Sequence, residues 1–331
     1  MIIFKIIIKI ICFIALLFSL KFPKKYLFFY IYFKCCLKYI QYYHYLDKKC
    51  LECPREIIFN GLNILSQEET LDEIIKNNRS ISRFGDGEFN IILGKRIGFQ
   101  EVNMKLIKKL KQVLKSKKKG LLVGIFFPYN NSYLRPFIYK TKKYIINWME
   151  KKKFKIFSLI DLNRKYYSSF ITRFYIDFKD KSKVPDYIRK LKLIWDKKDI
   201  LIIEGEKSRL GVGNDLFNNS KSIKRILCPA VNAFNVYDKI IDEARKIDKS
   251  NLILLALGPT STVLTYDLYK LGYQVIDVGH IDIEYEWFLR KAKKRIQIDN
   301  KYVNEALGNK YKIANVTDKK YYKEIISKIL N

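Results

Sequence analysis

The sequence has few cysteines and histidines, and they do not form the pattern of a disulfide framework or a zinc site. Five of the six cysteines lie in the first 53 residues, and Cys228 stands alone in a strand-like run. This distribution favours a reducing compartment. Cys50 and Cys53 form one C-x-x-C pair, but no second pair and no histidine at zinc spacing follows it. We therefore assign no zinc ion or redox pair to it.

Two glycine-rich nucleotide-binding patterns are also missing. The Walker pattern G-x-x-x-x-G-K-[ST] does not occur. The dinucleotide-binding pattern G-x-G-x-x-G is incomplete, because Gly85 and Gly87 match its first two glycines but Asn90 replaces the third. An enzyme that binds a dinucleotide or modifies a nucleotide sugar on a similar sheet is one alternative function for this chain. The incomplete G-x-G-x-x-G pattern does not support it.

Acidic residues are half as frequent as basic ones. Lys and Arg total 64 against 33 Asp and Glu, which gives a formal net charge of +31. Such a charge attracts polyphosphates, anionic lipid headgroups or nucleic acid. The alternative is a biased coding composition, because Lys, Ile, Asn, Tyr and Phe are all frequent. A basic, non-catalytic protein that binds membrane lipid or nucleic acid is therefore a second class to consider.

The N-terminal segment is hydrophobic but lacks an uninterrupted apolar run long enough for a clean transmembrane helix. The run from Ile10 to Leu20 is about half a bilayer span. Lysines and tyrosines then alternate with apolar residues, a composition that suits the headgroup boundary. No small-residue cleavage site of a secretory signal follows. We interpret residues 1–50 as a membrane anchor in or through the inner leaflet; the alternative is an apolar helix packed on the next domain.

From Pro54 onward, short β-branched runs alternate with longer amphipathic stretches. This pattern is typical of an α/β domain with a mainly parallel sheet flanked by helices. We assign residues 54–315 to this domain and residues 316–331 to a C-terminal amphipathic helix. The predicted strands are Ser80–Phe84, Gly120–Phe126, Lys155–Leu159, Asp199–Glu204, Ser222–Leu227, Asn251–Leu257 and Gln274–Val278. Ligands bind beyond the carboxyl ends of strands in such sheets, so motifs that follow the strands should converge there.

The first motif is R-F-G-D-G-E at residues 83–88, directly after a predicted strand. Asp86 and Glu88 are hard oxygen ligands separated by one glycine, and two such ligands can share a Mg²⁺ or Mn²⁺ that also holds a diphosphate. Gly85 and Gly87 allow a close backbone approach, and Arg83 can bind a phosphate or a carboxylate. The alternative is a pair of solvated acids in a turn.

Two further motifs combine glycine with polar side chains after strands. Residues 204–215 read E-G-E-K-S-R-L-G-V-G-N-D, in which Arg209 and Lys207 offer positive charge to phosphate oxygens. Residues 257–262 read L-G-P-T-S-T, in which Gly258 ends a strand and Pro259 starts a helix whose free N–H groups suit an anion. The alternatives are a surface loop with a salt bridge and, for Thr260 and its neighbours, helix capping.

The fourth motif surrounds one of only two histidines with acids. It reads D-V-G-H-I-D-I-E-Y-E-W at residues 277–287, and the other histidine is His44. Asp282 and Glu286 lie one helical turn apart on one face, whereas Glu284 points elsewhere. One of these acids, or His280, is a candidate base for an acceptor hydroxyl. For Trp287 the two interpretations are a platform for a sugar ring and a residue packed in the core or at its edge.

From about Thr70 to Glu305 the sequence resembles the GT-D family of bacterial glycosyltransferases, formerly a domain of unknown function. The resemblance lies in the motifs at 83–88, 204–217, 228–234, 257–260 and 279–288. It implies a Rossmann-like sheet, a nucleotide-diphosphate donor such as a UDP-sugar, and Mn²⁺ or Mg²⁺ held by Asp86 and Glu88. The hydrophobic N-terminal segment lies outside the resembling region.

The resemblance places further residues on family motifs. As catalytic candidates we take His280, Asp282, Glu286 and Glu206. As donor-binding candidates we take Arg83, Gly85, Gly87, Arg209, Asn214, Asp215, Asn232, Gly258 and Thr260. The expected partners are the donor, a glycan or glycoprotein acceptor in surface polysaccharide or glycoprotein synthesis, and the inner leaflet, which implies the cytoplasmic face of the bacterial inner membrane. Nucleic acid is not expected, because acids rather than a basic stripe with stacking aromatics cluster at the strand ends.

Overall fold

The computed structural model describes residues 62–126, 134–303, 305–306, 313 and 316–330. The predicted anchor at residues 1–50 lies outside these residues. Within them, no helix combines the length and the apolar character needed to cross a membrane.

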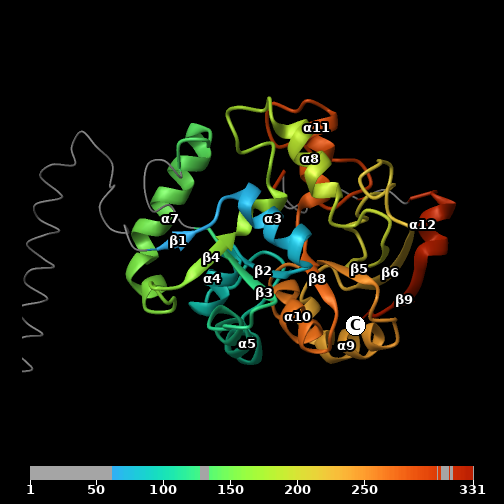
Figure 1. Cartoon of the computed structure of the whole chain (residues 1–331), viewed down its shortest axis with the longest axis horizontal. Helices are drawn as coiled ribbons and strands as arrows, with labels where there is room; N and C mark the ends of the chain where they lie inside the picture. Colours follow the sequence, from blue (N-terminus) through green and yellow to red (C-terminus); the bar gives the residue numbers. More distant parts are fainter. Residues whose placement is uncertain (1–61, 127–133, 304, 307–312, 314–315, 331) are drawn as a thin grey trace, which may run out of the picture. The chain divides into compact units, whose positions relative to one another are not determined.

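The described residues form a nine-stranded sheet in the order β1-β4-β3-β2-β8-β7-β5-β6-β9 (Figure 1), and every pair is parallel. The strands are β1 (Asn63–Ile64), β2 (Ser80–Phe84), β3 (Leu121–Ile125), β4 (Lys165–Ser168), β5 (Asp199–Gly205), β6 (Ser222–Cys228), β7 (Leu252–Ala256), β8 (Gln274–Asp277) and β9 (Ile325–Lys328). The parallel α/β architecture predicted from the sequence is therefore confirmed.

Helices cover both faces of the sheet (Figure 1). They are α3 (Gln67–Asn77), α4 (Asp86–Ile92), α5 (Met104–Leu114), α7 (Tyr139–Phe157), α8 (Val184–Lys192), α9 (Tyr237–Arg245), α10 (Pro259–Lys270), α11 (Ile281–Leu289) and α12 (Lys319–Glu324), with the 3-10 turns η1 (Ser169–Thr172) and η2 (Ala233–Val236). Because both faces are covered, the central strands β3, β5 and β7 are almost wholly buried.

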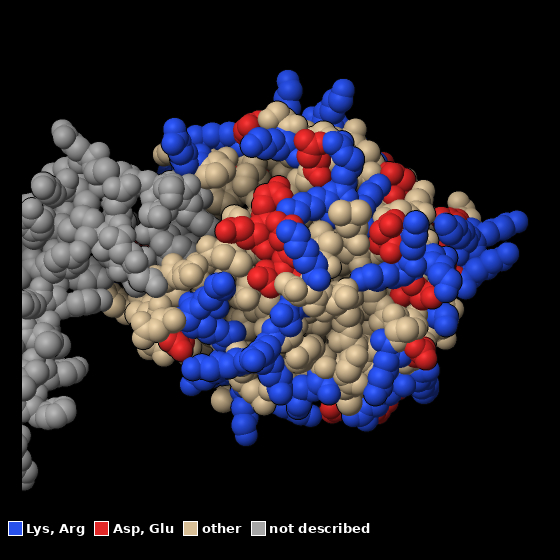
Figure 2. Space-filling model, in the orientation of Figure 1, with Lys and Arg blue, Asp and Glu red and all other residues tan. Residues whose placement is uncertain are grey.

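One core cluster joins the sheet to the helices on one of its faces. Leu71 and Ile74 of α3 and Leu191 of α8 pack with Ile81 of β2 and Ile202 of β5. The exposed side chains in the first two turns of α3 are mostly acidic. Figure 2 shows an acidic patch over α3, where Glu68, Glu69, Asp72 and Glu73 lie, on a face otherwise rich in lysine and arginine.

Two predicted elements differ from the structure. Residues 155–159 were predicted as a strand, but most of them form the end of α7, because Ile145, Trp148, Met149 and Ile156 bury one helical face. A short apolar run fits either period, and here the longer helical pattern decides. The strand of this region is β4, ten residues later.

The C-terminal segment is a short helix followed by a strand, where we predicted one amphipathic helix. Asp318 caps α12, whose six residues end at Glu324. The chain then pairs with β6 as β9. Arg225 fixes this arrangement, because its buried guanidinium bonds both Glu204 of β5 and Glu324 at 2.7 Å. A long-range ion pair of this kind has no local sequence signature.

Replacing Arg225 by Met should lower the free energy of unfolding by about 3–5 kcal/mol, because Glu204 would remain buried without its countercharge. The matched control is Lys221→Met, which removes an exposed pair with Asp199 and should cost at most about 1 kcal/mol. Urea unfolding of the full chain measures both. Equal, small effects would contradict the structural role given to Arg225.

Candidate active site

A cavity of about 540 Å³ opens beyond the carboxyl ends of β2, β3 and β8. Its walls come from the start of α4, from α7, from η1 with the segment that follows it, and from Arg295 and Glu305. Seven predicted site residues line it: Arg83, Gly85, Asp86, Gly87, Glu88, Gly258 and His280. The structure therefore brings the first, third and fourth motifs to one place, as expected for a parallel sheet.

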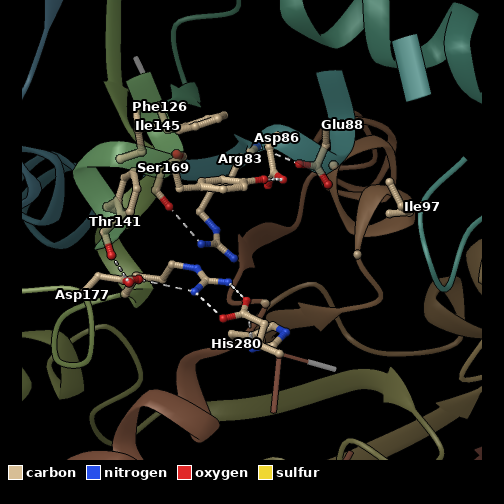
Figure 3. Close-up of a pocket in the computed structure, with 18 of the residues that line it drawn as sticks. Arg83, Asp86, Glu88, Ile97, Phe126, Thr141, Ile145, Ser169, Asp177 and His280 are labelled. Atoms are coloured by element: carbon tan, nitrogen blue, oxygen red, sulfur yellow. Dashed lines mark hydrogen bonds and ion pairs between the residues drawn. The ribbon is translucent and has the colours of Figure 1, made fainter. Parts of the chain in front are cut away.

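Asp86 and Glu88 project from the first turn of α4 (Figure 3). The Glu88 side chain turns back so that its Oε2 accepts the Gly85 backbone N–H at 2.7 Å. One oxygen of Asp86, Oδ2, accepts the Tyr144 hydroxyl at 2.5 Å. Each carboxylate thus uses one oxygen in a hydrogen bond with another described residue, whereas its second oxygen is bonded to no other described residue.

The environment of Glu88 disfavours its negative charge. Burial, together with the neighbouring carboxylate of Asp277, raises the pKa of Glu88 from 4.5 to about 7. A cation from outside the protein would favour the charged form of this buried carboxylate.

Arg83 is fully engaged by the protein. Its Nε donates to the Asp277 carbonyl at 2.6 Å, and its Nη2 to the Asp277 carboxylate at 3.1 Å. Its Nη1 donates to the Ser169 carbonyl at 2.9 Å and to the Thr172 hydroxyl at 2.6 Å. Of the two partners the sequence suggested, a phosphate or a carboxylate, the structure provides a carboxylate from its own chain. Arg83 therefore joins the ends of β2 and β8 to η1.

His280 precedes α11 and is a neutral imidazole. Burial, helped by the nearby arginines and opposed by the attraction of Glu305, lowers its pKa from 6.5 to about 4. Its Nδ1 lies 3.9 Å from the Glu305 carboxylate and has no hydrogen-bond partner among the described residues. In Figure 3, Arg83 lies between His280 and the pair formed by Asp86 and Glu88.

Several cavity residues were missed from the sequence. Arg173 and Arg295 both bond Glu305, and Arg295 also bonds Asp177 at 2.6 Å. They lie in segments without glycine-rich motifs. Two of these residues, Arg173 and Asp177, could have been found from the sequence. They are the only charged residues in the run T-R-F-Y-I-D-F at residues 172–178. Charged residues four apart in an apolar run indicate a buried ion pair.

A second cavity of about 110 Å³ adjoins the first and shares Phe99, Gly258, Gly279 and His280 with it. It lies after β5, β6 and β7. Gly258 has a φ of +55°, and the Phe99 ring fills the space that a Cβ there would need. A side chain at position 258 would therefore displace Phe99 from the wall between the two cavities.

Asp282 and Glu286 belong to a buried polar network. Asp282 accepts from the Gly211 N–H, the Asn214 amide and Lys301, and Glu286 accepts from Asn214 and Lys301. Burial opposes ionisation, yet Lys301 and Asn214 hold the pKa of Glu286 below its ordinary value. Asp282 lines the smaller cavity and Glu286 neither. Their contacts identify them as a clamp between α11 and residues 211–214.

The other predicted residues line neither cavity and stabilise loops. Arg209 donates to the Asn300 carbonyl, Asp215 accepts from Lys192 and Tyr285, Asn232 accepts the Glu101 N–H, and Thr260 donates to Gln100. The Glu206 backbone N–H donates to the Cys228 carbonyl. Direct contact of these residues with a donor or acceptor stays a prediction.

Comparison with known proteins gives one consistent family. A family profile described as the glycosyltransferase GT-D fold matches residues 81–306. The chain is 37% identical over 292 residues to the glycosyltransferase GlyD of Streptococcus pneumoniae serotype 4 (strain ATCC BAA-334 / TIGR4), covering 86% of this chain and 34% of that protein. It is also 37% identical over 266 residues to the probable glycosyl transferase Gly of Streptococcus gordonii, covering 78% and 37%. The chain therefore spans about a third of the length of these relatives.

The chain belongs to the GT-D family of glycosyltransferases. Solved structures agree with this assignment. One is the highly conserved domain of unknown function 1792 with a distinct glycosyltransferase fold, which superposes with a TM-score of 0.78 at 38% identity over 82% of this chain and 96% of that one. Another, a glycosyltransferase of that domain type from Streptococcus sanguinis, gives 0.76 at 34% identity over 81% and 99%.

The GT-D site offers two carboxylates to a cation. Among the described residues, no group of three or more His, Cys, Asp or Glu side chains is arranged to bind a metal ion. A cation held by Asp86 and Glu88 would take its remaining ligands from a diphosphate and water, which is how Mg²⁺ is commonly bound. The raised pKa of Glu88 is consistent with this fit.

Glu284 provides a test of how the cavity wall is held. Its Oε2 accepts the backbone N–H groups of Tyr175 and Ile176 at 2.9 and 3.1 Å, which fixes the segment carrying Arg173 and Asp177. Burial raises the pKa of Glu284 from 4.5 to about 7. An acid whose pKa is higher in the folded state favours folding below pH 4.5, and this contribution is lost as the pH rises through 7.

The Glu284→Gln variant should therefore show a flatter pH dependence of its unfolding free energy. The wild-type chain should lose about 2–3 kcal/mol more than the variant between pH 5 and pH 8. Urea titrations at the two pH values measure this difference. Parallel loss in both proteins would show that Glu284 does not titrate between them.

Proposed function

We propose that this GT-D chain transfers a sugar from a nucleotide-diphosphate donor, most simply a UDP-sugar, with a divalent cation held by Asp86 and Glu88. One observation carries the proposal. Five carboxylates line the large cavity, and three of them, Asp177, Asp277 and Glu305, pair with arginine. Asp86 and Glu88 form no ion pair with a described cation and accept only a hydroxyl and a backbone N–H.

A bound Mn²⁺ or Mg²⁺ would neutralise the charge that develops on the leaving nucleotide. The protein contributes the geometry. Asp86 and Glu88 lie in the first turn of α4. Gly258 and Gly279, both with positive φ, lie at the junction of the two cavities, where the Phe99 ring and the Arg83 guanidinium occupy the space that a Cβ at these glycines would need. This junction suits a diphosphate, because it lies at the N-terminus of α10.

His280 is the predicted catalytic group best placed to receive an acceptor proton. It alone of the four candidates lines the large cavity, and it is neutral. Asp282 and Glu286 are bonded to Lys301, and Glu206 lies outside both cavities. We assign the general-base role to His280 for a reaction that inverts the anomeric carbon.

The acceptor and the location of the enzyme are proposals from the sequence. A glycan or glycoprotein acceptor in surface polysaccharide or glycoprotein synthesis matches a glycosyltransferase at the cytoplasmic face of the inner membrane. Residues 1–50 would provide the membrane attachment. Deleting them and following fractionation tests this attachment, and a truncated chain that stays with the membranes would contradict it.

The Asp86→Asn variant should lose at least about 100-fold in metal-dependent donor turnover, because the amide keeps the shape of the carboxylate but removes its charge. A panel of UDP-, GDP- and CMP-sugars, each with and without Mn²⁺, measures donor choice and metal dependence together. The matched control is Asp242→Asn on the exposed face of α9, which should leave turnover unchanged.

Two results would overturn the proposal. One is an Asp86→Asn variant as active as the wild type. The other is a wild-type chain that turns over none of the donors and instead binds DNA or anionic lipid in a salt-sensitive manner, which would favour the non-catalytic class.

A further inference from the structure

Helices α4 and α7 meet along a seam of three contacts, one per turn of α7. At the end away from the cavity, Lys152 donates to the Asn90 side chain. In the middle, the Phe89 and Trp148 rings pack edge to face with centroids 6.3 Å apart. At the cavity end, the Tyr144 hydroxyl donates to Asp86. Residues 144, 148 and 152 are four apart and therefore lie on one face of α7.

The seam determines where the Tyr144 hydroxyl points. The two other contacts lie on the same face of α7, and with them the phenol comes within hydrogen-bond distance of Asp86 Oδ2. The 2.5 Å distance is that of a hydrogen bond to a charged oxygen. This hydrogen bond engages Oδ2 of Asp86. Its other oxygen, Oδ1, is hydrogen-bonded to no other described residue.

We propose that Tyr144 is a positioning residue that orients the Asp86 carboxylate for cation binding. The proposal rests on the cation site of the proposed function. A carboxylate at the start of a helix and at the edge of a cavity has rotational freedom that a cation must remove on binding. A hydrogen bond from outside the ligand set removes that freedom in advance, and the loss of such a bond commonly costs 10–100-fold in metal affinity.

The side chain of Tyr144 is suited to a clean test. It is 52% exposed, so the loss of its hydroxyl leaves no polar group buried without a partner except the Asp86 oxygen itself. Tyr139 gives a matched control, because it lies five residues earlier on α7, is 76% exposed and does not line the cavity. Phenylalanine at either position keeps the ring and removes only the hydroxyl.

The test measures Mn²⁺ binding to the full chain by electron paramagnetic resonance of free Mn²⁺. The wild type, Tyr144→Phe, Tyr139→Phe and Asp86→Asn are compared, with thermal unfolding of each protein in the absence of metal. We expect Tyr144→Phe to raise the Mn²⁺ dissociation constant about tenfold. We expect Tyr139→Phe to match the wild type and both phenylalanine variants to unfold at the wild-type temperature. Donor turnover of Tyr144→Phe should return to the wild-type value at saturating Mn²⁺.

The outcomes separate the two proposals. If the wild type binds Mn²⁺, Asp86→Asn does not, and Tyr144→Phe binds as tightly as the wild type, the positioning role is overturned and the cation site stands. If the wild type itself binds no Mn²⁺, either alone or with UDP present, the cation site fails and the positioning role fails with it. If Tyr144→Phe unfolds at a lower temperature without metal and turnover is not restored by Mn²⁺, its role is structural and the proposal is overturned.

Discussion

The guanidinium of Arg83 is the interaction on which the site depends. Parallel strands bring their carboxyl ends to one edge of the sheet, but they do not fix how the following segments sit beside one another. Arg83 does so, because it bonds Asp277 at the end of β8 and Ser169 and Thr172 of η1 from its own place near the end of β2. Gly279 leaves room for this guanidinium, where any Cβ would collide with it.

The charges of the cavity separate into two groups with different roles. Arginine pairs with Asp277, Asp177 and Glu305 and ties the walls together. A similar arrangement at the smaller cavity places Lys301 between Asp282 and Glu286. Among the five carboxylates that line the large cavity, those that form no ion pair with a described arginine or lysine are Asp86 and Glu88 of the R-F-G-D-G-E motif. In a chain with a net charge of +31, two cavity acids without an ion pair to a described cation favour a ligand that is itself a cation.

The sequence predicted the sheet and the convergence of its motifs, because both follow from local patterns. Six of the seven predicted strands lie within one or two residues of β2, β3, β5, β6, β7 and β8. What it could not predict are partners distant along the chain. Asp282 and Glu286 share a face as expected, but only the fold reveals that Lys301 meets both. Tyr144 lies in none of the sequence motifs. Its proposed role in orienting Asp86 follows from contacts between α7 and α4.

The most direct test is a crystal structure of the full chain with Mn²⁺ and UDP, read by the anomalous scattering of manganese. The account predicts an anomalous peak between the Asp86 and Glu88 carboxylates, with the diphosphate bound to the same ion and reaching toward Gly258. A peak elsewhere, or UDP bound without an ion at these carboxylates, would contradict it.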